Sequence, residues 1–300
     1  MRMATTLLAS GILALSAAPA FAVTDGALDG AYGPALHTQT TQTQFGDATD
    51  GVPGFTNGSE LDIAYGTIDG TTLRLFLGGN LQSNFNKLEI FIDCIGGGQN
   101  RLRGDNPNVD FDGLNRMGDD GSGNGLNFDD GFEADFYVTM TNGDGGAGHA
   151  IFANYAELLT GGGGAGYYLG QAAAQNGTLS GGSNPNGIEL TLDNSNTAGV
   201  DGGCGASSGA GVTTGMELAI PLSALGNATG CFKVSVMVNG GGHDFLSNQV
   251  LGSLPPGTCN LGEPRGVDFR QYAGDQFFVV CDNPTNSERS SWGRVKVMYR

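Results

Sequence analysis

Basic residues, histidine and tryptophan are scarce in this chain of 300 residues. It has 13 Lys and Arg against 30 Asp and Glu, a formal net charge of −17, three histidines and one tryptophan. So acidic a surface repels the phosphates of nucleic acids and anionic lipids, which excludes a nucleic-acid-binding protein. No stretch beyond the N-terminal segment approaches the ~20 apolar residues that a transmembrane helix needs, so we expect no transmembrane anchor.

A zinc centre and the common catalytic motifs are missing too. The sequence has no paired CxxC motifs, and no histidine has a metal-ligating neighbour two or four residues away. Gly205–Gly209 reads G-x-S-x-G, but it lies in glycine-rich sequence and lacks the strand and helix that position a nucleophilic serine. We therefore expect a protein that is not an enzyme. A polysaccharide-acting enzyme, which needs two carboxylates facing each other across a cleft, is the less favoured alternative.

The N-terminal segment predicts export. Residues 1–22 combine Arg2, an apolar run and an Ala-Phe-Ala ending, which are the features of a secretory signal peptide. Cleavage after Ala22 removes one arginine and no acid, so 30 acidic residues then face 12 basic ones, for a net charge of −18. We expect the protein to be secreted and to act outside the cell or at the cell surface.

No amphipathic helical pattern of about twelve residues or more is present, and apolar residues instead alternate with polar ones. Roughly ten short segments have this period of two, separated by Gly, Asn and Asp, with Asp69–Gly70 as a hairpin turn. The segments are Glu60–Asp69, Thr71–Asn80, Lys87–Cys94, Phe132–Gly143, His149–Leu159, Gly166–Gln171, Gly187–Asn194, Gly215–Leu225, Cys231–Gly240 and Gln276–Asp282. They predict an all-β fold over residues 23–282, with one jelly-roll-like β-sandwich and long Gly/Asp/Asn-rich loops. We expect fewer than about a tenth of the residues to be helical.

The C-terminal segment, residues 283–300, differs from the rest. A polar spacer leads to Trp292, the only tryptophan, and to a short basic and aromatic ending. One interpretation is a final edge strand packed on the sandwich. The other is a tail that export or surface-attachment machinery recognises, because the ending resembles short Trp-Gly-x-x-Lys termini of some secreted bacterial proteins.

Five cysteines lie in the mature chain, and export favours disulfide formation. An odd number leaves at least one thiol unpaired. Cys94 is the expected free cysteine, because it continues the inward-facing apolar series of its predicted strand. Short loops then favour the bridges Cys204–Cys231 and Cys259–Cys281, although the sequence alone allows other pairings.

The order of the predicted strands resembles that of two groups of secreted β-sandwiches. Leu88–Asp93 reads L-E-I-F-I-D, and Glu217–Leu225 reads E-x-x-I-P-x-x-x-L. An early strand of the first kind and a late strand of the second are similar to those of family-nine carbohydrate-binding modules and DOMON-like ligand-binding domains. The resemblance implies a sandwich fold and a ligand-binding role. The stretches GHDFLSNQVLG and NLGEPR are similar to uncharacterised secreted bacterial proteins, which implies no function.

Glycan binding would require exposed aromatic rings, which stack on the apolar face of a sugar. The carbohydrate-binding modules use exposed tryptophans, whereas Trp292 stands alone and outside the matched strands. Tyr155, Tyr167 and Tyr168 are therefore the candidate ligand-binding residues. The alternative for all three is a place in the core or in cross-strand packing.

The acidic segment after the third predicted strand is a candidate calcium site. Four residues match ligand positions one, three, five and twelve of the calcium-loop template: Asn108, Asp110, Asp112 and Asp119. Gly113 matches the glycine of its turn, and nine acidic residues between Gly104 and Asp135 face one basic residue. The alternative is a solvated acidic turn. Ca²⁺ is thus the candidate cofactor.

These patterns together predict a secreted, non-catalytic β-sandwich that binds a glycan or another cell-surface polymer with the help of calcium. The competing interpretation is a structural or adhesive component of an extracellular matrix, without a small ligand. Exposed aromatic residues on a concave face would favour glycan binding. A smooth polar sheet with acidic loops would favour the structural role.

Overall fold

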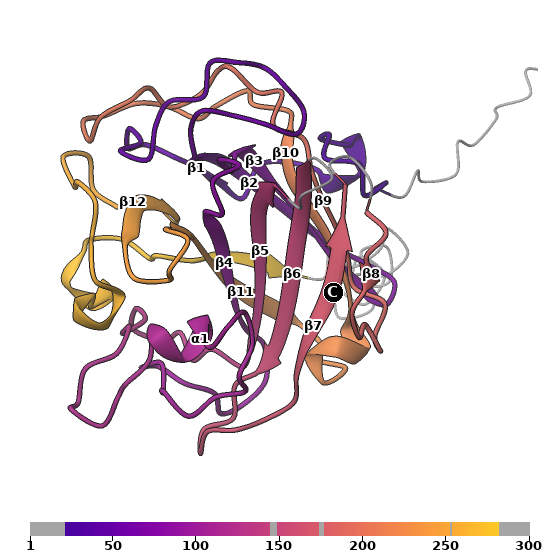
Figure 1. Ribbon diagram of the computed structural model, residues 1–300, viewed down its shortest axis with the longest axis vertical. Coiled ribbons are helices and arrows are strands. Elements are labelled where there is room, and N and C mark those ends of the chain that lie inside the picture. The colour runs from indigo at the N-terminus through magenta and orange to yellow at the C-terminus, as the bar shows by residue number, and fades with distance from the viewer. Residues whose placement is uncertain (1–21, 145–148, 174–176, 253, 282–300) are drawn as a thin grey trace, which may run out of the picture.

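The computed structural model describes residues 22–144, 149–173, 177–252 and 254–281 (Figure 1). Of these residues, 39% are in β-structure and 7% in short helices, and two antiparallel sheets account for the named strands, which confirms the predicted all-β, sandwich-like fold. The predicted signal peptide, apart from Ala22, and the predicted C-terminal segment 283–300 lie outside the described residues. No helix in the described ranges is long and apolar enough to cross a membrane.

The smaller sheet has five strands in the order β1-β2-β3-β10-β9. Their bounds are β1 His37–Thr38, β2 Glu60–Asp69, β3 Thr72–Asn80, β9 Glu189–Leu192 and β10 Gly215–Pro221. β2 and β3 form the predicted hairpin, in which Asp69 pairs with Thr72 and Gly70 has a φ of 61°. Glycine adopts this left-handed conformation without the steric penalty of a side chain, which explains why the Asp-Gly signal marked the turn correctly.

The larger sheet has eight strands, seven of them in the order β12-β11-β4-β5-β6-β7-β8, with β13 paired to β11. Their bounds are β4 Lys87–Asp93, β5 Phe136–Asp144, β6 His149–Glu157, β7 Gly166–Ala172, β8 Ser180–Gly181, β11 Cys231–Asn239, β12 Leu246–Leu251 and β13 Phe278–Cys281. Figure 1 shows the long strands β4 to β7 running side by side through the centre of the molecule.

The helices of the described part are each three or four residues long and lie in the connections. They are η1 Gly30–Tyr32, α1 Gly113–Arg116, η2 Leu222–Leu225, η3 Pro264–Gly266 and η4 Phe269–Gln271. The predicted absence of a long helix between residues 156 and 173 is confirmed, because strands β6 and β7 occupy that region.

The inner core lies between the two sheets. The period of two in β4 turns Leu88, Ile90 and Ile92 to one face, where they join a single buried cluster with Leu75 and Leu77 of β3. Each of these five side chains is 0% exposed. Full burial of such a side chain contributes about 1.5–3 kcal/mol, so this layer contributes strongly to the stability of the sandwich.

A second layer covers the opposite face of the larger sheet. The outward residues Phe91 of β4 and Tyr137 of β5 are buried in a second cluster with Phe128, from the segment 95–135, and Phe269, from the segment after β12. The rings of Phe91 and Phe128 meet edge to face, with centroids 4.8 Å apart. Figure 1 shows α1 and the chain around it on the same side of the sheet as the yellow segment after β12. The acidic segment is therefore a packed layer on the sheet.

The disulfide pairing corrects the sequence-based prediction. Cys204 bonds to Cys259, and Cys231 bonds to Cys281, so the expected bridges Cys204–Cys231 and Cys259–Cys281 are wrong. Strand β13 pairs with β11 and places Cys231 directly opposite Cys281, and this proximity across the sheet overrides proximity in sequence. Cys94 is the free cysteine of the described residues, as predicted, and packs partly buried against the inner core.

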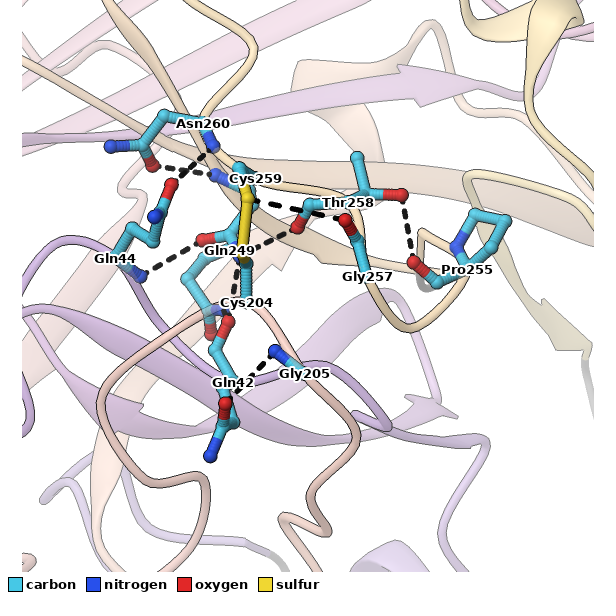
Figure 2. The surroundings of a disulfide bond; sticks show 11 residues. Gln42, Gln44, Cys204, Gly205, Gln249, Pro255, Gly257, Thr258, Cys259 and Asn260 are labelled. Carbon is cyan, nitrogen blue, oxygen red and sulfur yellow. Dashed lines mark hydrogen bonds between the residues drawn. A yellow bond between two sulfur atoms is a disulfide. The ribbon is translucent and has the colours of Figure 1, made fainter.

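Figure 2 shows the Cys204–Cys259 bridge and the loops that it joins. The backbone N–H of Gly257 donates to the carbonyl of Cys204 at 2.7 Å, and the N–H of Asn260 donates to the side chain of Gln44 at 2.7 Å. The side chain of Gln42 accepts from the N–H of Gly205 at 2.8 Å. The bridge thus fastens the connection before β10 to the connection after β12, with an N-terminal segment bound to both.

Candidate ligand-binding site

A cavity of about 650 Å³ lies on the outer face of the larger sheet, beside the covering layer. Lys87 of β4, Thr141 of β5, Phe152 and Asn154 of β6, and Tyr168 of β7 supply its floor. Lys87 pairs with Thr141 and Thr141 pairs with Phe152, so these three side chains form one row across three strands. The alternation of side chains along a strand is what turns this row away from the inner core.

Aromatic rings border the cavity. Phe111 is 101% exposed, Phe85 46% and Tyr168 41%, and all three line the cavity. Phe111 belongs to the wall contributed by the covering layer, Asn108–Phe111, and Phe85 precedes β4. Large rings left in water at the edge of a cavity are typical of a surface that a ligand covers.

Hydrogen-bond donors lie at the bottom of the cavity. The Nζ of Lys87 is 2.9 Å from Asp110 Oδ2 and donates to Thr141 Oγ1 at 2.9 Å. An ammonium group has three hydrogens, so one remains for a ligand. Asn154 Oδ1 accepts the backbone N–H of Asp110 at 3.3 Å, and its Nδ2 has no partner among the described residues. The floor therefore offers donors to the hydroxyl oxygens of a ligand.

A buried charge network lies behind the floor. Glu89 accepts hydrogen bonds from Tyr137 Oη at 2.6 Å and Asn239 Nδ2 at 3.1 Å, and its Oε1 is 2.8 Å from Nδ1 of His243. The other ring nitrogen, Nε2, is 3.0 Å from Asp110 Oδ2. Burial alone would lower the pKa of His243, but the two carboxylates outweigh it and raise this pKa to about 9. His243 is therefore an imidazolium at neutral pH.

The same network fixes the charge of Asp110. Burial would raise the pKa of Asp110, but the hydrogen bond from His243 and the charge of Lys87 outweigh burial and lower this pKa below its ordinary value. Two cationic side chains thus balance the two buried carboxylates, Asp110 and Glu89. Such balance is necessary, because an uncompensated buried charge costs several kcal/mol.

Backbone strain is concentrated around this site. Of the six non-glycine residues with positive φ in the described part, four line the cavity or belong to the adjoining network: Phe85 (70°), Asp110 (47°), Phe111 (55°) and His243 (53°). A fifth, Asp112 (69°), lines an adjacent cavity. Each such conformation costs on the order of 1 kcal/mol and persists only where its surroundings impose it. Strain of this kind gathers at functional sites, which is a second reason to place the site here.

The structure separates the three tyrosines that the sequence singled out. Tyr168 lines the cavity. Tyr155 faces the inner core, is 2% exposed, and donates its hydroxyl to the carbonyl of Ala224 at 2.6 Å. Tyr167 packs against the same core and stacks on Tyr155, with ring centroids 6.2 Å apart. The expectation of a ligand-facing position fits Tyr168 and is wrong for Tyr155 and Tyr167, because alternation turns neighbouring side chains to opposite faces.

The four predicted calcium ligands do not share a single cavity. Asn108 and Asp110 line the cavity described above, Asp110 and Asp112 line an adjacent one, and Asp119 lines a third. Asp110 is occupied by Lys87 and His243, and Asp119 by Arg101 at 3.0 Å. Within the described ranges, no group of three or more His, Cys, Asp or Glu side chains is arranged to hold a metal ion.

Sequence reasoning missed most of the site. It assigned no role in a binding site to Lys87, Phe85, Phe111 or His243. One signal was present: Lys87 and Glu89 occupy successive outward positions of a strand, with the apolar Leu88 between them. That pattern is typical of a solvated face, and only the covering layer turns it into a buried network.

Comparison of the chain with protein-family models, curated proteins and solved structures finds no match.

Proposed function

We propose that this protein is a secreted, non-catalytic β-sandwich that binds a neutral glycan in the cavity bordered by Phe85, Phe111 and Tyr168. The observation that carries the proposal is the combination of exposed rings at the edge and hydrogen-bond donors on the floor. Sugars present apolar C–H faces and hydroxyl groups, so rings and donors together match both. The cavity volume of about 650 Å³ lies within the range of small-ligand sites.

The charges of the site favour a neutral ligand. Lys87 is already paired with Asp110, and the chain has a formal net charge of −17, which repels acidic polymers. The same pairing favours binding over catalysis. Glu89 and Asp110 each face His243 within 3.0 Å, so neither is a free carboxyl group poised for proton transfer to a ligand. Two disulfides fit an oxidising, extracellular setting.

Affinity electrophoresis through gels that contain single soluble polysaccharides, neutral and acidic, tests the proposal. The wild-type protein should be retarded by at least one neutral polysaccharide. Phe111→Ala and Tyr168→Ala should each weaken binding roughly tenfold, because each removes a stacking surface worth about 1.4 kcal/mol. Phe245→Ala is the matched control, since Phe245 is 47% exposed but does not line the cavity.

Other outcomes decide between the alternatives. Retardation that survives both cavity variants would place the glycan elsewhere and reject this site. No retardation by any polysaccharide would favour the structural or adhesive role. Shortening of the polysaccharide during incubation, abolished by the cavity variants, would show an enzyme and overturn the non-catalytic assignment.

A further inference from the structure

Two carboxylates at the start of β2 are buried without a cationic partner. Glu60 and Asp62 are each 0% exposed, and neither takes part in the ion pairs of the described residues. The pairing of β2 with β3 shifts its register between Leu61 and Ile63, so Asp62 is the extra residue of a bulge. A bulge redirects side chains, and here it lets Asp62 and Glu60 converge.

Four oxygens converge on one atom, Nδ2 of Asn196. Glu60 Oε1, Asp62 Oδ2 and Asn80 Oδ1 are each 3.1 Å from it, and the carbonyl oxygen of Ala198 is 2.5 Å from it. An amide nitrogen has only two hydrogens. None of the four oxygens has another hydrogen-bond donor among the described residues, so at least two are left without a donor from the chain. Glu60, Asp62 and Asn80 are all 0% exposed, so water does not reach them from bulk solvent.

The remaining contacts of the carboxylates hold them in place. The second oxygen of Glu60 accepts the N–H of Ala48 at 3.1 Å, and that of Asp62 accepts the N–H of Val200 at 2.8 Å. Burial, and for Glu60 next the charge of Asp62, raises the pKa of Glu60 to about 9, and burial raises that of Asp62 to about 8. The site is thus rigid, rich in oxygen and short of positive charge.

We propose that Glu60, Asp62, Asn80 and the Ala198 carbonyl are ligands of a calcium ion. A half-turn of the Asn196 amide exchanges Nδ2 for Oδ1 and adds a fifth oxygen, in place of the hydrogen bond that Oδ1 accepts from the N–H of Ala198 at 3.2 Å. Calcium suits these oxygen ligands, because it binds six to eight carboxylate, amide and backbone oxygens in irregular geometry. Magnesium requires a tighter octahedron of ligands. Two of the ligands are acidic side chains, and the others are neutral amide and carbonyl oxygens.

The ion would join three parts of the chain. Glu60 and Asp62 begin β2, Asn80 ends β3, and Ala198 lies in the connection from β9 to β10. That connection also contains Cys204 and forms bridges with the segment at Thr41 and Thr43. Figure 1 shows the early (purple) and late (orange) loops side by side beyond the ends of β2, β3 and β10. Calcium would therefore stiffen the loops at this end of the sandwich, independently of the glycan cavity.

Isothermal titration calorimetry of the full exported chain, freed of metal with a chelating resin, tests the site directly. Calcium chloride should bind with one ion per chain and a Kd of about 1 mM or tighter. Glu60→Gln combined with Asp62→Asn should abolish binding, because the amides keep the shape and remove the charge. Glu217→Gln is the matched control, because Glu217 is also buried, at 1% exposure. Its carboxylate, however, accepts hydrogen bonds from the Tyr32 hydroxyl and from the backbone N–H groups of Asp25 and Gly26.

Thermal unfolding supplies a second measurement. Calcium at a hundredfold excess over Kd should raise the Tm of the wild type by about 5–10 °C and leave that of the double variant unchanged. Without calcium, the double variant should unfold at the same temperature as the wild type or above, because its amides supply the missing hydrogens. If that variant does not fold, Asp62→Asn alone serves. Calcium binding that persists in a folded variant, or no binding by the wild type at about 10 mM calcium, would overturn the proposal.

Discussion

His243 lies between two carboxylates, with Nδ1 2.8 Å from Glu89 Oε1 and Nε2 3.0 Å from Asp110 Oδ2. Glu89 belongs to the sheet and Asp110 to the layer that covers it. The imidazolium therefore connects the two with charge-assisted hydrogen bonds, which are about twice as strong as neutral ones. The side chains of all three are at most 5% exposed, so solvent does little to screen them.

This arrangement predicts a loss of stability at alkaline pH. The pKa of His243 is raised from 6.5 to about 9, so its contribution to the free energy of unfolding is complete below pH 6.5 and disappears as the pH rises through 9. The contribution is roughly 3 kcal/mol, at about 1.4 kcal/mol for each unit of pKa shift. Urea unfolding of the wild type and of His243→Gln from about pH 6 to pH 10 measures it.

The comparison with the variant isolates His243. Glu60 and Asp62 have raised pKa values of about 9 and 8, so their ionisation also destabilises the fold as the pH rises. This dependence of the unfolding free energy on pH is common to the wild type and the variant. Only the difference between their two pH dependences is due to His243. Equal slopes in the two proteins would show that His243 is not charged at neutral pH.

Two neighbouring aspartates should respond differently to substitution. Asp110→Asn leaves Lys87 and His243 without a counter-charge in a buried site, at a cost of about 3–5 kcal/mol. Asp112 is exposed and accepts one hydrogen bond, from Asn115 at 2.8 Å, so Asp112→Asn should change stability by less than about 0.5 kcal/mol. Urea unfolding at neutral pH, without calcium, measures both.

The same two variants test the calcium-loop hypothesis, which stays a prediction. If Asp110 and Asp112 hold calcium, both variants lose the calcium-dependent rise in Tm. If Glu60 and Asp62 hold it, both variants keep that rise. The two candidate sites are thus distinguished by four aspartate or glutamate substitutions and one measurement.

Adjacent tyrosines show how far the sequence determines the site. The period of two requires Tyr167 and Tyr168 to face opposite sides of β7, so one of them had to face away from the inner core. Which one does so depends on register, and the pairing of β6 with β7 shifts between Ala153 and Asn154. Such a shift depends on long-range packing that no local pattern records. The strands and the β2–β3 hairpin were therefore predictable, whereas the face of each tyrosine was not.

The covering layer was unpredictable for a related reason. Leu114 and Phe128 lie in a segment rich in glycine and aspartate, without a periodic pattern, and yet they are buried against β4 and β5. A periodic pattern identifies strands and helices that bury one face. An irregular segment buries individual side chains at irregular intervals, so its sequence shows no pattern that would predict their burial. Glu89 and His243 are buried because this layer covers them. In the same way, the pairing of Cys231 with Cys281 results from the contact between β11 and β13. Each depends on contacts between residues far apart in the sequence.

Two buried tyrosine hydroxyls provide a matched pair. Tyr137 Oη donates to the carboxylate of Glu89 at 2.6 Å, and Tyr155 Oη donates to the neutral carbonyl of Ala224 at 2.6 Å. Substitution with phenylalanine removes one oxygen from each and creates little space. Tyr137→Phe should cost about 1.5–3 kcal/mol, because it removes a charged hydrogen bond, and Tyr155→Phe about 0.5–1.5 kcal/mol. Urea unfolding at neutral pH ranks them, and equal costs would indicate that Glu89 is not ionised.

Gly113 is a glycine of the covering layer that lies directly against His243. A Cβ there would lie 2.1 Å from Cδ2 of His243, so the imidazole or the α1 backbone must move. Gly113→Ala should cost about 1–3 kcal/mol, typical of overpacking in a core. The displaced imidazole loses its position between Glu89 and Asp110, so the variant should also lose the part of the alkaline destabilisation that His243 produces.

Gly161→Ala is the control for this substitution. A Cβ at Gly161 would meet nothing within 4 Å, and the residue needs no positive φ, so its stability should change by less than about 0.5 kcal/mol. Urea unfolding at about pH 7 and pH 10 measures both variants. If Gly113→Ala is as stable as Gly161→Ala and keeps the wild-type pH dependence, the imidazole is not held tightly between its carboxylates. In that case His243 would not anchor the cavity wall Asn108–Phe111 through its contact with Asp110.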